Sequence, residues 1–174
     1  SNRGVEPLCR AMLNDPDHVV REWCAAALEA IKSKDAISAL VLAMKRDSAK
    51  DVRLRASVAL RALRASEALR DLLSYGDPEI RGMAVTSLAK IGDRESLSDV
   101  SRLMKDDDAE VRRRAVAFMG DVAGEDDCEQ AVGYLAEALQ DREVTVRSEA
   151  RKSLGNIKGE RACDLALSAL KDED

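Results

Sequence analysis

The sequence predicts an all-α protein, an alpha-alpha superhelix (solenoid) of about five and a half antiparallel helical hairpins. One motif recurs five times: an acidic turn precedes an apolar residue, an arginine, and further small or apolar residues at helical spacing. Its best copy is DDDAEVRRRAVAFMGDV, residues 106–122. A period of roughly 30 residues with fixed apolar offsets is typical of stacked helical repeats. An alternation of period two persists nowhere, so no β-strand is expected.

The five copies align when the apolar residue before the arginine is numbered zero. Position 0 holds Val20, Val52, Ile80, Val111 and Val146. Position +4 is small in every copy: Cys24, Ala56, Ala84, Ala115 and Ala150. Position +8 holds Leu28, Leu60, Leu88, Met119 and Leu154, and position +11 holds Ile31, Leu63, Ile91, Val122 and Ile157. These offsets share one side of a helix, so they predict the buried side of the second helix of each hairpin.

Each hairpin should consist of two helices joined by a loop of a few residues, which makes consecutive helices antiparallel. The first helices are expected over 5–14, 35–45, 66–74, 94–105, 127–140 and 160–171. The second helices are expected over 18–31, 50–64, 78–91, 109–123 and 144–157. A single array therefore spans residues 3–174, with units at about 4–32, 34–64, 66–91, 94–123 and 126–157 and a half unit at 160–174.

Capping residues support these boundaries. A carboxylate that can accept from the free amides of the first turn precedes four second helices, at Asp17, Asp77, Asp108 and Glu143. Ala49 is the exception, before the second helix at 50–64. Gly92, Gly124 and Gly159 follow three second helices, where a left-handed residue would end the helix.

The two ends of the sequence carry separate expectations. Ser1 and Asn2 look like a remnant of a cleaved expression tag, because the chain has no initiating methionine. The half unit lacks its second helix, so either Ala162–Leu170 caps the array or the chain is part of a longer protein, and we favour the second. An uncapped last helix could also pair with a second copy of the chain.

Composition restricts the function. The formal net charge of −5 argues against nucleic acid as the main partner, although basic clusters occur locally. The four cysteines show no metal-ligand spacing, so no metal or other cofactor is expected. Reduced, scattered thiols suit the cytoplasm, and no apolar run is long enough to cross a membrane.

The repeated turn resembles HEAT repeats, in particular the short HEAT-like repeats named after phycobilisome lyases, which have an armadillo-like superhelical fold. The resemblance rests on DPDHVVREWCAAALEAI, DDDAEVRRRAVAFMGDV and DREVTVRSEARKSLGNI. It implies a structural ladder of turn aspartates and arginines between neighbouring units. The ladder would contain Asp15, Asp47, Asp106 and Asp141 with Arg21, Arg53, Arg81, Arg112 and Arg147. The third unit departs from the pattern, since Tyr75 stands where the aspartate belongs.

In that family the concave face binds partners, and positions +2, +3, +6 and +10 of the second helices line it. In the first three units these positions include apolar residues, namely Trp23, Leu54, Val58 and Met83. Later units place Arg113 and Arg114 there, and Arg55 lies beside Leu54. These residues predict a site for an elongated apolar peptide or helix whose charged end meets the two arginines. Alternatively, Trp23 packs against the first helix or a seam between units.

We therefore expect a non-catalytic scaffold that binds another protein. His18 is the sole histidine and lies in a turn, which gives no basis for a catalytic relay. Two alternatives remain. The resemblance allows a subunit of a bilin lyase, an enzyme that attaches a tetrapyrrole to a client cysteine. The arginine clusters allow a nucleic-acid-binding module, although acidic residues accompany each cluster.

Overall fold

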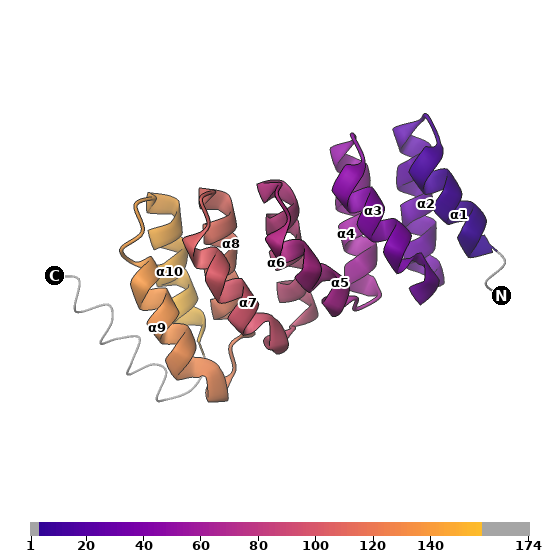
Figure 1. Ribbon diagram of the computed structural model, residues 1–174. Helices are drawn as coiled ribbons and strands as arrows, with labels where there is room; N and C mark the ends of the chain where they lie inside the picture. The colour runs from indigo at the N-terminus through magenta and orange to yellow at the C-terminus, as the bar shows by residue number, and fades with distance from the viewer. Residues whose placement is uncertain (1–3, 158–174) are drawn as a thin grey trace. The chain divides into compact units, whose positions relative to one another are not determined.

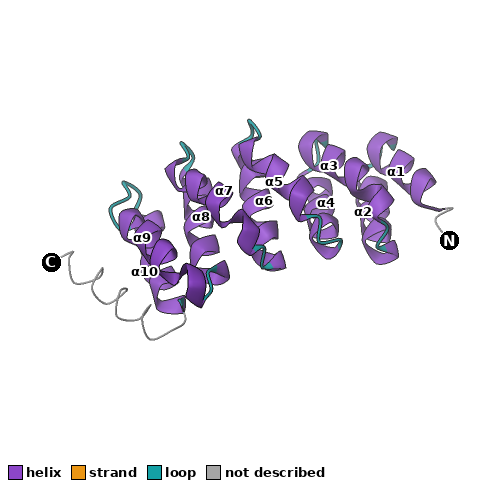
Figure 2. Cartoon of the chain, turned by 60° about the horizontal axis from the view of Figure 1, so that its bottom comes forward, coloured by secondary structure: helices purple, strands orange, loops and turns teal. Residues whose placement is uncertain are grey.

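A computed structural model describes residues 4–157 as helices and short connections, and no strand occurs in that range (Figures 1 and 2). The chain divides into two compact units. Unit 1 ends at Tyr75, and unit 2 begins at Gly76. The division falls inside the third predicted hairpin, at the turn where the sequence departs from the repeat.

Unit 1 holds two complete hairpins and the first helix of a third. The first hairpin joins α1 (Val5–Asn14) to α2 (His18–Ile31). The second runs from η2 (Lys34–Ala36) through α3 (Ile37–Arg46) to α4 (Lys50–Ala62). Helix α5 (Ser66–Arg70) and η3 (Asp71–Ser74) follow. Helix α1 packs on α2, α3 packs on α4, and the two hairpins stack through α2 against α4 and α1 against α3 (Figure 1).

Unit 2 repeats this arrangement. It begins with α6 (Pro78–Ile91) and continues through η4 (Arg94–Ser96), α7 (Leu97–Arg102) and η5 (Leu103–Lys105) to α8 (Ala109–Val122). Then η6 (Glu125–Asp127) and α9 (Cys128–Ala138) lead to α10 (Val144–Asn156). The second helices stack in the order α6, α8, α10, while α7 and α9 pack on α8 and α10. The all-α solenoid class predicted from the sequence is therefore confirmed.

The buried side of the second helices follows the predicted offsets. Every residue at positions +4 and +8 is buried. Position 0 is buried in four copies but not in the first, where the expectation is wrong: Val20 is exposed, and so is Ile31 at position +11. Both residues lie on the side of α2 that points away from α4, and no other described helix covers that side.

The aspartate caps form at three of the predicted positions. The side chain of Asp17 accepts a hydrogen bond from the amide of Val19, that of Asp77 from Glu79 and that of Asp108 from Val111. Ala49 leaves α4 without a side-chain cap, because alanine has no polar side-chain atom that could accept a hydrogen bond. The expectation for Glu143 is wrong, since its side chain makes no cap. Instead, its amide donates to the Asp141 carboxylate at 2.8 Å.

Left-handed residues end three of the helices, but glycine supplies only one of them. Gly92 follows α6 with φ 73°, as predicted. Lys32 follows α2 with φ 55°, and Arg64 lies just beyond α4 with φ 50°. The expectation for Gly124 is wrong, because Ala123, the residue that follows α8, has an extended backbone and already ends the helix. Gly124 instead lies against Arg94, whose Cζ would be 2.9 Å from a Cβ at this position.

The predicted helix at 160–171, Gly159 and the proposed pairing through the last helix lie outside the described residues. Several first helices are shorter than expected, because α5 and α7 each give way to a 3-10 turn before the acidic turn.

Within the part of the chain that the structure describes, no helix is both long and apolar enough to cross a membrane.

Candidate protein-binding surface

Arginines at position +1 hold the hairpins together through a bidentate contact. In unit 1, Arg21 donates from Nε and Nη2 to the two carboxylate oxygens of Asp47 at 2.7 and 2.8 Å. Its Nη1 also donates to the carbonyls of Asp15 and Pro16 in the preceding turn. The same guanidinium therefore closes its own hairpin and binds the next one.

Unit 2 contains this contact twice. Arg81 binds Asp106 at 2.8 and 2.7 Å, and Arg112 binds Asp141 at 2.7 and 3.0 Å. The Arg112 and Asp141 side chains are only 5% and 11% exposed. The hydrogen bonds from Arg112 lower the pKa of the Asp141 carboxyl below its ordinary value of 3.8, against the opposing effect of burial. The pair is therefore ionised across the physiological pH range.

Two ladder positions of unit 1 differ from this pattern. Arg53 donates from Nη1 to the carbonyls of Asp47 and Ser48, but the following turn offers Tyr75 in place of an aspartate. Lys45 lies 5.2 Å from the centroid of the Tyr75 ring. At the other end of unit 1, Asp15 accepts the Asp17 amide at 2.9 Å, and no arginine of the described residues reaches its carboxylate.

Contacts between successive second helices have a constant register. Arg55, at position +3 of α4, approaches Glu22 and Glu29 of α2 at 3.5 and 3.9 Å. Glu149, at +3 of α10, accepts from Arg113 of α8 at 2.9 Å. A Cβ on Gly82 of α6 would lie 3.1 Å from Cδ of Arg114, at +3 of α8. Within each unit, position +3 of a second helix therefore lies near position +2 of the second helix before it, and Arg55 also approaches position +9.

This register separates the predicted binding residues of unit 1 into two surfaces. The first, called the α4 face, consists of Leu54, Arg55 and Val58; Leu54 is 52% exposed and Val58 is half-buried. The second, called the α2 end face, is the side of α2 that points away from α4, and Trp23 on it is 72% exposed. The α2 end face consists of Val19, Val20, Trp23, Ala27 and Ile31. Trp23 therefore neither lines a groove beside Leu54 nor packs against a seam within the described residues.

Met83 was expected on the exposed stripe, and this expectation is wrong. Met83 is only 7% exposed. Met83 occupies position +3 of α6, and this position is also partly covered in α4, α8 and α10. The pattern of positions +2, +3, +6 and +10 did not distinguish a covered position from one open to solvent, because both kinds recur at helical spacing.

Arg113 and Arg114 lie together on α8, but carboxylates of the same unit already bind them. Arg113 donates two hydrogen bonds of 2.8 Å to Glu110, and Arg114 donates one of 2.8 Å to the same residue. These hydrogen bonds lower the pKa of Glu110 from 4.5 to about 2, and the bonds from Arg113 contribute most. Burial of the carboxyl opposes this shift. Both arginines border a shallow groove of about 340 Å³ between α6 and α8, lined also by Thr86, Lys90 and Asp121.

A second groove of about 340 Å³ was not anticipated. It lies between the first helices of two hairpins of unit 2, with Arg102 and Met104 on one side and Tyr134 and Glu137 on the other. These residues carry no motif, because the repeat signature lies on the second helices. Only the stacking of η5 and α9 shows that they are neighbours.

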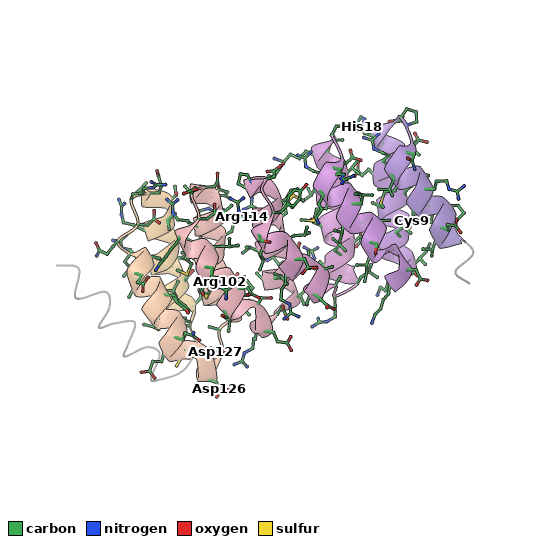
Figure 3. The ribbon with its side chains drawn as sticks, in the orientation of Figure 1. Cys9, His18, Arg102, Arg114, Asp126 and Asp127 are labelled. Carbon is green, nitrogen blue, oxygen red and sulfur yellow. The ribbon has the colours of Figure 1, made fainter. Side chains whose placement is uncertain are left out.

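Catalytic or metal-binding groups do not assemble in the described residues. No group of three or more His, Cys, Asp or Glu side chains there could hold a metal ion. His18 is exposed at the start of α2, while Cys9 lies on α1 (Figure 3). Burial, with a smaller effect of nearby aspartates, raises the pKa values of the Cys9 and Cys24 thiols above 9.0. Both thiols are therefore protonated and poorly nucleophilic.

Comparison with known protein families agrees with this geometry. The family model described as HEAT repeats matches residues 1–61, 43–120, 66–135 and 100–174, which together span the chain. The protein therefore belongs to the HEAT repeat family. A comparison with curated protein sequences finds no match.

Several solved structures share the fold. A designed armadillo repeat protein in complex with the peptide (KR)4 is 21% identical, with a TM-score of 0.64, covering 97% of this chain and 90% of its own. Computationally designed armadillo repeat proteins for modular peptide recognition are 22% identical, with a TM-score of 0.60 and coverages of 97% and 91%. The complex of CpcE and CpcF of phycocyanin lyase from Nostoc sp. PCC7120 is 18% identical, with a TM-score of 0.50 and coverages of 100% and 77%.

Proposed function

We propose that the chain is a non-catalytic scaffold that binds another protein, and that the α4 face provides a contact in unit 1. The observation that carries this proposal is the exposure of Leu54. A leucine that is about half exposed, on a helix whose Val52 and Leu60 are buried, gains free energy when a partner covers it. Full burial of such a side chain is worth about 1.5–3 kcal/mol.

The flanking groups of the α4 face favour a specific partner over nonspecific adhesion. Arg55 lies beside Leu54 on α4, and its guanidinium approaches Glu22 and Glu29 of α2. An apolar centre beside an oriented charged pair has the composition of a protein-binding surface, in which polar groups surround an apolar anchor. The partner should therefore present an apolar side chain to Leu54 and Val58 and a polar group to Arg55.

In unit 2 the proposed contact is the groove between α6 and α8. Its cations, Lys90, Arg113 and Arg114, occur with the acidic Asp121, and Glu110 holds the two arginines in place. A partner that approaches this groove meets arginines whose orientation is already fixed, which lowers the entropy cost of binding. Their existing ion pairs favour a partner with polar groups of both signs over a purely anionic one such as nucleic acid.

The designed neighbours support a peptide as the form of the partner. One of them was solved with the peptide (KR)4, and others are described as designed for modular peptide recognition. These descriptions support a peptide segment as the form in which a partner would bind this chain.

The test is affinity capture from the source organism's lysate with three immobilised forms: the unchanged chain, Leu54→Glu, and Val144→Glu as a matched control. Val144 is an exposed apolar residue on α10 and belongs to neither proposed contact. A protein retained by the unchanged chain and by Val144→Glu but lost by Leu54→Glu supports the proposal. Equal retention by all three folded forms contradicts it.

The lyase complex favours one alternative, a subunit of a bilin lyase. That protein consists of two chains, CpcE and CpcF, and it shares only the fold with this chain. Transfer of a bilin to a client cysteine by this chain, dependent on a second subunit, would favour the alternative over a scaffold. An unchanged absorption spectrum of the client in the presence of bilin, client and a candidate second subunit supports the scaffold.

A further inference from the structure

The α2 end face is apolar, exposed and regular. Val20, Trp23, Ala27 and Ile31 stand at positions 0, +3, +7 and +11, which follow one another along one side of a helix. Val19 extends the same surface at the start of α2. All of these side chains except the half-buried Ala27 are exposed, and Trp23 is the sole tryptophan of the chain.

In later hairpins the same positions form the stacking surface between second helices. Positions 0 and +7 are buried in α4, α8 and α10. The contacts identify what covers them. A Cβ on Gly120 of α8 would lie 2.6 Å from Cβ of Ser153, at position +7 of α10. Arg55 at +3 of α4 approaches Glu22 of α2. On each of these helices, the covering element is the second helix of the preceding hairpin.

Asp15 provides an independent observation at the same end of unit 1. Its carboxylate makes the same turn contact as its counterparts, accepting an amide two residues later at 2.9 Å. Asp47, Asp106 and Asp141 each also accept two hydrogen bonds from the arginine of the preceding hairpin. No described arginine makes these bonds to Asp15, so its carboxylate is available to a guanidinium on the same side as the α2 end face.

We propose that the α2 end face is a stacking surface for the second helix of a further HEAT-type hairpin, whose position +1 arginine binds Asp15. The apolar positions and the carboxylate select the same partner independently. The partner helix brings small residues at its positions +6 and +9, as Ala117 and Gly120 do on α8. Trp23 then packs where Glu149 packs on α10.

A second copy of the chain meeting this face with its own α2 end face fits less well. The arginine that such a copy would offer, Arg21, already binds Asp47 within its own unit. An apolar contact would form, but Asp15 would gain no guanidinium. The occupant is therefore a second helix that brings an arginine of its own.

The test supplies such a helix and uses Trp23 as the reporter. A copy of residues 94–127, which holds the α8 hairpin and the loop that follows it, is fused ahead of Val5 of the full chain. The added sequence contains no tryptophan, so emission still reports Trp23 alone. The matched control is the same fusion with Val20→Glu and Ile31→Glu, two exposed residues whose substitution leaves Trp23 in place.

The expected result is an emission maximum at shorter wavelength and weaker acrylamide quenching in the fusion than in the parent chain. The helical circular dichroism should increase by the amount that one hairpin adds. The control fusion should keep the emission of the parent, and Asp15→Asn should lower the melting temperature of the fusion more than that of the parent.

Three results would overturn the proposal. The emission and quenching of the fusion could equal those of the parent chain. The added residues could contribute no helix, which would show that the face does not accept the hairpin. The parent chain could form a dimer by light scattering, with Trp23 protected from quenching, in which case a second copy occupies the face.

Discussion

Arg112 and Asp141 lie on successive hairpins of unit 2 and are joined by two nearly parallel hydrogen bonds, at 2.7 Å from Nε and 3.0 Å from Nη2. Nη1 of the same arginine donates to the carbonyls of Asp106 and Asp107, at 2.8 and 3.1 Å. Every described polar contact of this buried guanidinium is therefore directed at a turn. Removal of the side chain would take the guanidinium away from two carbonyls and from a carboxylate that would keep only the Glu143 amide as a described donor.

Arg112→Ala should lower the free energy of unfolding by about 3 kcal/mol or more, because breaking a buried ion pair leaves a charge uncompensated. Urea unfolding followed by circular dichroism measures the change. Arg102→Ala is the control, since Arg102 forms only an exposed pair with Asp99 at 3.6 Å. Its effect should stay within about 0.5 kcal/mol. Equal effects of the two substitutions would show that the ladder does not stabilise unit 2.

The stability that Asp141 contributes should depend on pH. Its pKa in the folded state lies below the ordinary 3.8. At pH values around and between these two pKa values, the unfolded state therefore binds more protons than the folded state. The contribution is therefore complete above pH 3.8 and declines as the pH falls through the lowered pKa. The difference in unfolding free energy between the unchanged chain and Asp141→Asn should shrink along that path. A difference that stays constant from neutral pH into that window would contradict the assignment.

Gly120 and Gly133 should respond to alanine in opposite directions. A Cβ on Gly120 would lie 2.6 Å from Cβ and 2.8 Å from Cα of Ser153, so α8 and α10 would have to separate. We expect a loss of about 1–3 kcal/mol. Gly133 lies within α9 with nothing within 4 Å of a Cβ, so its alanine variant should gain about 0.5–1 kcal/mol. Thermal unfolding of the two variants and the unchanged chain measures both changes in stability. A stabilising Gly120→Ala would contradict the close packing of α8 on α10.

Ala49→Asp should stabilise unit 1 by about 1 kcal/mol, because it supplies the cap that α4 lacks. The backbone of Ala49, with φ −85° and ψ 124°, already has the conformation of the capped positions. Asp108→Ala, which removes an existing cap from α8, should cost a similar amount. Denaturant midpoints of both variants measure the effect. If Ala49→Asp were neutral while Asp108→Ala destabilised, repulsion from Asp47 would have cancelled the gain.

The fold was predictable because positions +4 and +8 are buried in all five second helices. Val52, Val111 and Val146 are buried at position 0, and the aspartate caps identify three helix starts. The helix ends were less predictable, since Lys32 and Arg64 adopt left-handed conformations that their residue types do not favour. The backbone hydrogen bonds that close these helix ends, from the Lys32 amide to the Leu28 carbonyl and from the Ala65 amide to the Leu60 carbonyl, accompany those conformations, and the residue types at the two positions do not signal them.

The binding surface was only partly predictable. Helical spacing correctly placed Leu54 and Trp23 at the protein surface, because both lie away from positions +4 and +8. It failed for Met83, because the spacing along a single helix does not show that this position is buried. It also missed that Glu110 binds both Arg113 and Arg114, because a charge partner three or four residues away looks like any solvated residue in a sequence this rich in charge.

All five position +1 arginines donate to a carbonyl of their own turn, whereas the bidentate contact needs an aspartate on the next hairpin. Arg53 still closes its own turn, although the next turn offers Tyr75. The arginine occurs in all five copies, while the aspartate is missing from the copy at the boundary between the two units. Replacement of one aspartate therefore removes a link between two hairpins without opening the hairpin that carries the arginine.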